Sequence, residues 1–298
     1  MVRSPIRVQH GKHMFTRMYS RVAGIVWSGV IAGSILASGP VLALDGNAKS
    51  RAASAAPLKM FKDPHGASLQ GAEARNKGDV ATSLSALKYA ADGGEPLAAW
   101  KLGWMYSRGE GVPKNDLAAY RYYFRIVRDY NEDQLRPAQR SIVSSAFVAV
   151  GAYYLTGIPN SKVHRNLQRA MHLFHYAATS FRDANAQYNL ARMYLDGAGT
   201  ERSPSKAVRW LRVAAEKNHV EALAVLGNLL FVGDSGVARR RAKGLMYLTL
   251  ASELAGSSSR LMWVNNLHDK ALHLADQTDR EMARIELKKH LRHRSRGR

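Results

Sequence analysis

Apolar residues recur every three to four positions along most of the chain, and small residues accompany them at fixed places. Ala98, Leu102 and Tyr106 follow at i, i+4 and i+8, which predicts an apolar stripe along one face of a helix. Gly103 lies beside that stripe and has no side chain, so a partner helix can approach its backbone closely. Gly109 ends the pattern and predicts a left-handed C-cap.

The same offsets return three times. The four sets are Ala98, Gly103, Tyr106 and Gly109; Ala146, Gly151, Tyr154 and Gly157; Ala186, Ala191, Tyr194 and Gly197; and Ala222, Gly227, Leu230 and Gly233. Constant offsets within a unit, with variable distances between units, are typical of a repeat array whose loops differ in length. The second member of each set is the expected close-packing position: Gly103, Gly151, Ala191 and Gly227.

Two kinds of signal mark the helix ends. Asn115 predicts the N-cap of a helix at 116–128, and Ser203-Pro204 predicts a cap followed by a first-turn proline. After residue 256 the glycine pattern stops, and helices are expected at 260–274 and 280–291, the second opened by a Thr278-x-x-Glu281 capping box. The basic end of the chain, from Arg292, is expected to fray.

These observations predict an all-α fold, a right-handed α-solenoid of helix-turn-helix repeats with terminal capping helices. No stretch shows the alternation expected of β-strands. The predicted organisation is a signal peptide at 1–43, a flexible tether at 44–64, the solenoid at 65–256, and capping helices with a basic tail at 257–298.

The N-terminus predicts export to the periplasm. Basic residues precede an apolar run at 22–37, no acid occurs before Asp45, and Val41-Leu42-Ala43 has the small-x-small pattern of a signal-peptidase site. The alternative is an uncleaved anchor, although the run is shorter than the roughly 20 residues that a membrane span needs. Removing residues 1–43 lowers the net charge from +21 to +16.

Composition argues against several kinds of chemistry. Cysteine is absent, which excludes disulfides, thiol catalysis and Cys-ligated zinc. His172 and His175, like His290 and His293, have helical i, i+3 spacing, but no supporting ligand accompanies either pair. The glycine-rich loops lack the Gly-Lys-Ser/Thr ending of a phosphate-binding loop. We therefore expect no enzyme activity, no metal and no cofactor.

A protein-binding surface is the better expectation. On the first helix of each repeat, positions beside the glycine stripe are expected to line the concave side of the solenoid, where aromatic and Arg side chains can anchor a partner. These candidates are Trp100, Trp104, Ser107, Tyr188, Arg192, Leu195, Asn228 and Phe231. The alternative for the two tryptophans is that they belong to the core.

The positive charge suggests a second hypothesis. Basic clusters occur at 239–243 and 288–298. An exported protein meets little nucleic acid, so we expect anionic membrane lipid or acidic polymer to be the neighbour of these clusters. On this alternative the protein is an envelope adaptor, and its binding weakens as salt rises.

The pattern Ala-x-x-x-Leu-Gly-x-x-Tyr-x-x-Gly-x-Gly-Val at 98–112 resembles the Sel-like repeats, a branch of the tetratricopeptide-type α-solenoids. Two departures are Ala191 in place of a glycine and the loss of the closing Gly-x-Gly in repeat two. A narrower resemblance rests on Ala86-Leu-Lys-Tyr-Ala-Ala91, Met105-Tyr-Ser-Arg-Gly-Glu-Gly-Val112 and Tyr154-Leu-Thr-Gly-Ile-Pro159. These segments are similar to the ExoR family of periplasmic negative regulators of exopolysaccharide production.

That resemblance implies a periplasmic protein that binds the sensor domain of an inner-membrane histidine kinase and holds the kinase inactive. It also implies that proteolysis of the regulator releases signalling. The family supplies no catalytic residues to assign, and the resemblance does not account for the basic C-terminal tail.

Overall fold

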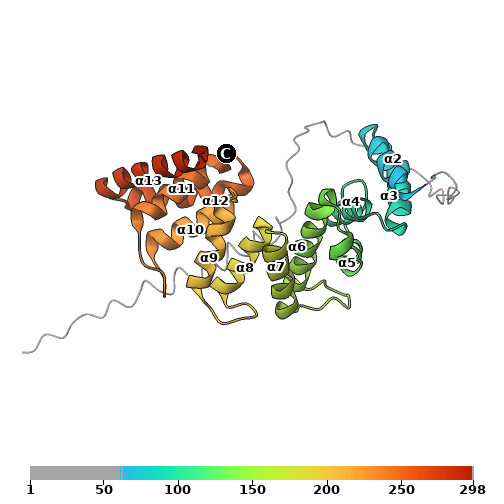
Figure 1. Ribbon diagram of the computed structural model, residues 1–298, viewed down its shortest axis with the longest axis horizontal. Coiled ribbons are helices and arrows are strands. Elements are labelled where there is room, and N and C mark those ends of the chain that lie inside the picture. Colours follow the sequence, from blue (N-terminus) through green and yellow to red (C-terminus); the bar gives the residue numbers. More distant parts are fainter. Residues whose placement is uncertain (1–60, 62, 297–298) are drawn as a thin grey trace, which may run out of the picture. The chain divides into compact units, whose positions relative to one another are not determined.

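The computed structural model describes residue 61 and residues 63–296. Regular structure in this part of the chain is helical, and the described residues contain one short antiparallel bridge, between Asp234 and Val237. The prediction of an all-α helical solenoid is confirmed (Figure 1). The predicted signal peptide at 1–43 and most of the predicted tether at 44–64 lie outside the described residues.

The helices follow the predicted pairs closely. They are α2 (Pro64–Asn76), α3 (Val80–Asp92), α4 (Pro96–Arg108), α5 (Asp116–Arg128), α6 (Arg140–Thr156), α7 (Leu167–Ser180), α8 (Ala184–Asp196), α9 (Pro204–Ala215), α10 (Val220–Val232), α11 (Arg241–Ala255), α12 (Met262–Leu274) and α13 (Gln277–Arg296). Short 3-10 turns η2 (Glu132–Gln134) and η3 (Pro137–Gln139) lie between α5 and α6, and η4 (Ser259–Leu261) directly precedes α12.

The chain divides into two compact units, and the boundary falls within α4, between Ala98 and Ala99. The first unit contains the helical hairpin α2–α3. Gly71 of α2 lies against α3, where the Ser83 hydroxyl donates a hydrogen bond to the Gly71 carbonyl oxygen at 2.7 Å. An added Cβ at Gly71 would come within 3.1 Å of the Leu87 side chain, so the hairpin packs at close range.

In the second unit, each pair packs on the next. Besides the contacts within the pairs α6–α7, α8–α9 and α10–α11, α5 contacts α6, α7 contacts α8, and α9 contacts α10. Figure 1 shows this succession from α5 to α11. Because neighbouring pairs pack on one another, the core of each repeat is buried by stacking, as in other solenoids.

The four close-packing positions lie inside this stack. At Gly103 an added Cβ would come within 2.8 Å of the Tyr123 ring, and at Gly151 within 2.7 Å of the Phe174 ring. Ala191 is completely buried. At Gly227 the neighbour is main chain as well as side chain, because the carbonyl oxygen of Gly244 on α11 would lie 2.8 Å from the added Cβ.

The capping signals of the repeats are confirmed. The Asn115 side chain accepts a hydrogen bond from the backbone N–H of Ala118 at 2.9 Å. Ser203 caps α9 through the N–H of Lys206, with Pro204 in the first turn. Gly109 has a positive φ of 74°, a conformation that other residues adopt at a cost, and so ends α4 as predicted.

The end of the chain differs from the prediction. α13 begins at Gln277, and its cap is Asp276, whose carboxylate accepts from the N–H of Asp279 at 2.8 Å; Thr278 is therefore inside the helix and is not its cap. The helix continues to Arg296, beyond Arg292, where fraying was expected. The two terminal helices pack on α11, and Ala271, Ala275 and Ala283 share a core with Phe231.

None of the helices between residues 63 and 296 is long and apolar enough to cross a membrane.

Replacing Gly103 or Gly244 with alanine tests whether these contacts hold the stack together. Gly103→Ala pushes a methyl group into the Tyr123 ring and should cost about 1–3 kcal/mol of unfolding free energy. In Gly244→Ala the new methyl group meets backbone atoms of Phe231 and Gly227, which cannot rotate away as a side chain can. This substitution should therefore lower the unfolding free energy by more, about 3 kcal/mol or above. Urea denaturation followed by circular dichroism measures both, and two unchanged midpoints would contradict the packing scheme.

Candidate protein-binding site

The expected groove residues of α4 are half-buried. Trp100, Trp104 and Ser107 each keep part of their surface, and the Ser107 hydroxyl donates a hydrogen bond to the Trp104 carbonyl oxygen at 2.8 Å. The guanidinium of Arg108 lies over the Trp104 ring, 5.1 Å from its centroid. This cation–π contact holds the indole in place while leaving it in reach of a partner.

The expected groove residues of α8 are placed differently. Leu195 is partly exposed, but Tyr188 and Arg192 are buried, with 4% and 6% of their surface exposed. The Arg192 guanidinium donates to the Tyr188 hydroxyl at 3.2 Å and lies 3.7 Å from the Asp196 carboxylate. The prediction of an open groove here is wrong, because the His219 ring of the next repeat stacks on Tyr188 with the centroids 4.9 Å apart.

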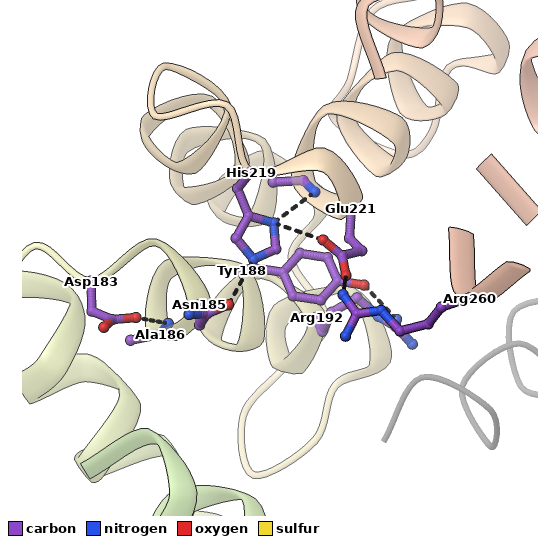
Figure 2. Close-up of polar contacts among 9 residues, drawn as sticks. Asp183, Asn185, Ala186, Tyr188, Arg192, His219, Glu221 and Arg260 are labelled. Carbon is purple, nitrogen blue, oxygen red and sulfur yellow. Dashed lines mark hydrogen bonds and ion pairs between the residues drawn. The ribbon is translucent and has the colours of Figure 1, made fainter. Parts of the chain in front are cut away.

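His219 links α8 to α10 (Figure 2). Its Nδ1 accepts from the backbone N–H of Ala222 at 3.2 Å, which makes the ring the N-cap of α10. The proton is therefore on Nε2, which donates to the Asn185 side-chain oxygen at 3.1 Å. The Glu221 carboxylate lies 3.5 Å from Nδ1 and pairs with Arg260 at 2.8 Å.

Burial lowers the pKa of His219 below its ordinary value of 6.5, since the charged ring would lose its hydration. Glu221 and Asp183 oppose this shift and Arg260 reinforces it. The neutral ring is also the form that the cap requires, because a proton on Nδ1 would face the N–H of Ala222. The cluster in Figure 2 is thus a junction between repeats and not an open binding site.

The expected groove residues of α10 are also covered. Asn228 and Phe231 are 7% and 5% exposed. Phe231 belongs to the core beneath the terminal helices, and the Arg241 guanidinium of α11 lies 5.0 Å from its ring centroid. The prediction that these two side chains line a groove is wrong, because α11 and the capping helices close this end of the array.

The second helix of repeat one carries an exposed surface that the sequence analysis did not identify. Ala119, Tyr120, Tyr123 and Ile126 bury one face of α5. The opposite face forms a shallow hollow of about 440 Å³, and the residues lining it are Arg121, Tyr122, Phe124, Arg125 and Arg128. We call these five residues the α5 surface.

The charge of the α5 surface is unbalanced. Arg128 forms two hydrogen bonds with the Asp129 carboxylate, at 2.6 and 2.9 Å, and Arg125 lies 3.9 Å from the same group. These contacts, the hydrogen bonds from Arg128 foremost, hold the pKa of Asp129 below its usual value. Arg121 adds a third guanidinium to the α5 surface, while none of its five lining residues is acidic.

Aromatic stacking fixes the helix beneath these cations. Phe124, which is 37% exposed, stacks on Tyr120 with the centroids 5.4 Å apart, and Tyr122 stacks on Tyr106 of α4 at 5.8 Å. Tyr120 also shares a hydrogen bond with the Tyr154 hydroxyl of α6 at 2.9 Å. Rigid aromatic and Arg side chains on a supported helix are the residue types that dominate protein interfaces.

A sequence signal for the α5 surface exists. Arg121, Arg125 and Arg128 follow at i, i+4 and i+7, with Phe124 among them, on a helix whose other face is strongly apolar. The predicted binding residues lie on the first helix of each repeat, where a concave groove was expected, so this signal on the second helix was not used.

The histidine pairs contribute no visible metal site. His172 and His175 are exposed on α7, and the His175 ring lies against Trp210 with the centroids 6.0 Å apart. His290 packs against Tyr247. Within residues 63–296, no three His, Asp or Glu side chains gather at metal-binding distances.

The repeats match a known family model. The model described as Sel1 repeat matches residues 96–126, 146–180, 184–219 and 220–255. The first, third and fourth segments cover the pairs α4–α5, α8–α9 and α10–α11, and the second covers α7 and most of α6.

Two relatives match more than four fifths of the chain, and each is described as an exopolysaccharide production negative regulator. The protein from Rhizobium meliloti (strain 1021) is 32% identical over 247 residues, which is 83% of this chain and 86% of the relative. The protein from Rhizobium leguminosarum bv. viciae is 31% identical over 256 residues, which is 85% of this chain and 89% of the relative.

A solved structure supports the fold. The crystal structure of a Sel1 repeat protein from Oxalobacter formigenes superposes with a TM-score of 0.56 at 20% identity, covering 76% of this chain and 88% of that chain.

Acid should weaken the junction at His219. Because the folded-state pKa is lowered, the unfolded chain binds a proton first as the pH falls below about 6.5. The contribution of His219 to the free energy of unfolding is therefore fully present above that pH and declines below it. Urea denaturation between about pH 7 and pH 5 measures the slope. His219→Asn keeps a capping oxygen but cannot titrate, so it should flatten the slope; equal slopes in both proteins would rule out His219 as the cause.

Proposed function

Since this chain belongs to the Sel1-repeat family of exopolysaccharide production negative regulators, we propose that it represses exopolysaccharide synthesis by binding a membrane sensor protein in the periplasm. The proposed partner is the periplasmic domain of an inner-membrane sensor histidine kinase, whose inactive state the bound regulator stabilises. The observation that carries this proposal is the α5 surface, with its three guanidinium groups and exposed aromatic ring on a rigid helix.

The α5 surface favours binding over catalysis. Its functional groups are guanidinium, phenol and phenyl groups, which recognise a complementary acidic or aromatic surface. The half-buried Trp104 with Arg108 on its ring offers a second anchor from α4 of the same repeat. Both anchors belong to repeat one, so we propose repeat one as the docking site.

The mechanism is a shift of populations. A regulator that binds only the inactive kinase stabilises that state by RT ln(1 + [L]/Kd), about 2.7 kcal/mol when its concentration is 100 times Kd. Loss of the regulator returns the kinase to its active state, so signalling depends on how much intact regulator is present.

The compartment is inferred from the N-terminal sequence. The basic start, the apolar run at 22–37 and the cleavage pattern ending at Ala43 support export. An exported regulator can meet only the outer domain of an inner-membrane kinase, which is why the proposal places the contact in the periplasm.

Crosslinking in intact cells tests the partner and the docking site together. Arg121→Glu with Arg128→Glu reverses two cations of the α5 surface, and both side chains are exposed, so the fold should survive. We expect the wild-type protein to crosslink to a sensor histidine kinase and the double variant to lose at least about 90% of that product, since rim and core charges steer and hold such contacts.

The matched control is Lys162→Glu with Arg209→Glu, which makes the same charge change at exposed positions away from α5. It should crosslink like the wild type. If no membrane sensor is captured and deletion of the gene leaves exopolysaccharide unchanged, the regulatory proposal fails. If the kinase is captured equally by both variants, only the docking site is wrong.

Trp104→Ala separates a binding role from a core role for this side chain. As an interface anchor it should weaken capture of the kinase domain by about 30-fold or more, with the helical circular dichroism unchanged. Surface plasmon resonance with the purified kinase domain measures the affinity. A variant that unfolds, or that binds with unchanged affinity, would remove Trp104 from the docking site.

A further inference from the structure

The last two helices do more than close the array. α13 packs on α11 (Figure 1). On its inner face Ala283 and Leu287 join the terminal core, and the His290 ring contacts the Tyr247 ring. Arg241 of α11 and Asp279 of α13 form an ion pair at 2.9 Å. These contacts fix the rotation of α13, so its other side faces outward.

The outward side of α13 is strongly basic. Between residues 284 and 296 the sequence has six Lys or Arg and a single acid, Glu286. Arg284, Lys288, Lys289 and Arg292 are all exposed in the structure.

The same helices also expose aliphatic side chains. Of the twelve large hydrophobic side chains that are exposed in the described part of the chain, six lie on α12 and α13: Met262, Leu272, Leu274, Met282, Ile285 and Leu291. On α12, Leu274 is 69% exposed, and on α13, Ile285 and Leu291 are 46% and 48% exposed. A cap whose only task is to hide the last apolar face of a solenoid would carry polar residues here.

We propose that the exposed side chains of α12 and α13, termed here the cap face, bind the surface of an anionic lipid bilayer. Lysine and arginine side chains are attracted to anionic headgroups, and the neighbouring Leu and Ile side chains enter the boundary between headgroups and acyl chains. An acidic polysaccharide or a nucleic acid would attract the cations equally but would gain little from the aliphatic groups.

This contact is peripheral and reversible. The side chains that face α11 stay in the core, so only the outer residues reach the lipid. Binding would confine the protein to the plane of the membrane and raise its local concentration beside any membrane-embedded partner. Lipid binding by these helices does not require any particular protein partner.

Vesicle co-sedimentation with the full-length protein tests the proposal. The protein should sediment with vesicles of phosphatidylglycerol and phosphatidylcholine, should not sediment with phosphatidylcholine alone, and should be released as salt rises. Lys288→Glu with Lys289→Glu should weaken this binding by at least about tenfold. Lys162→Glu with Arg209→Glu, the same charge change elsewhere, should leave it within about twofold of the wild type.

A second variant distinguishes lipid from other occupants. Ile285→Ser with Leu291→Ser retains every cation, so it should lose vesicle binding while binding dextran sulfate as the wild type does. Equal binding of this variant and the wild type to vesicles would overturn the proposal in favour of a general polyanion site. A dimer seen by sedimentation velocity that the serine variant abolishes, without any vesicle binding, would assign the cap face to a second copy of the chain.

Discussion

Close approach of helix backbones at a few small residues is the constraint on which this fold depends. At Gly103 and Gly151 the space that a side chain would fill is taken by an aromatic ring of the paired helix, and at Gly227 it is taken partly by main chain. A solenoid has no central core shared by all its repeats, so its stability is a sum of such local interfaces. Glycine on one helix of a pair leaves room for a large side chain of the other helix to be buried completely, as Tyr123 and Phe174 are.

Local signals in the sequence were sufficient to predict the helices of the repeats and where they begin and end. Asn115, Ser203 and Gly109 act through their own backbone and the next turn, so their roles follow from their neighbours in the chain. The burial of Tyr188 could not be inferred in this way. The ring that covers it, His219, lies 31 positions further along, and only the stacking of two repeats brings them together. The prediction that Phe231 lines a groove was wrong for the same reason, since the core that encloses this side chain is completed by residues of α11 to α13.

Repeat one and the helices after the last repeat therefore offer different surfaces. Repeat one keeps cations and aromatic rings on the outside of α4 and α5, where a folded protein surface can meet them. In α8 and α10 most of the corresponding side chains are buried, namely Tyr188, Arg192, Asn228 and Phe231, so these helices offer fewer groups to a partner. The helices after the last repeat combine cations with exposed aliphatic groups, a pairing that suits a lipid boundary better than a protein groove. A protein partner bound at repeat one and a lipid surface bound at the cap face would contact different residues, so the protein could bind both at once.

The close contact between Gly227 of α10 and Gly244 of α11 restricts which substitutions the protein can tolerate. At Gly103 the neighbour is a side chain, so a larger residue could be accommodated by a smaller one at position 123. At Gly244 the neighbours are the backbone atoms of Phe231 and Gly227, which no substitution on the facing helix can shorten. A side chain at Gly244 therefore cannot be accommodated by shortening a residue of α10, so Gly244 should tolerate replacement less well than Gly103 does.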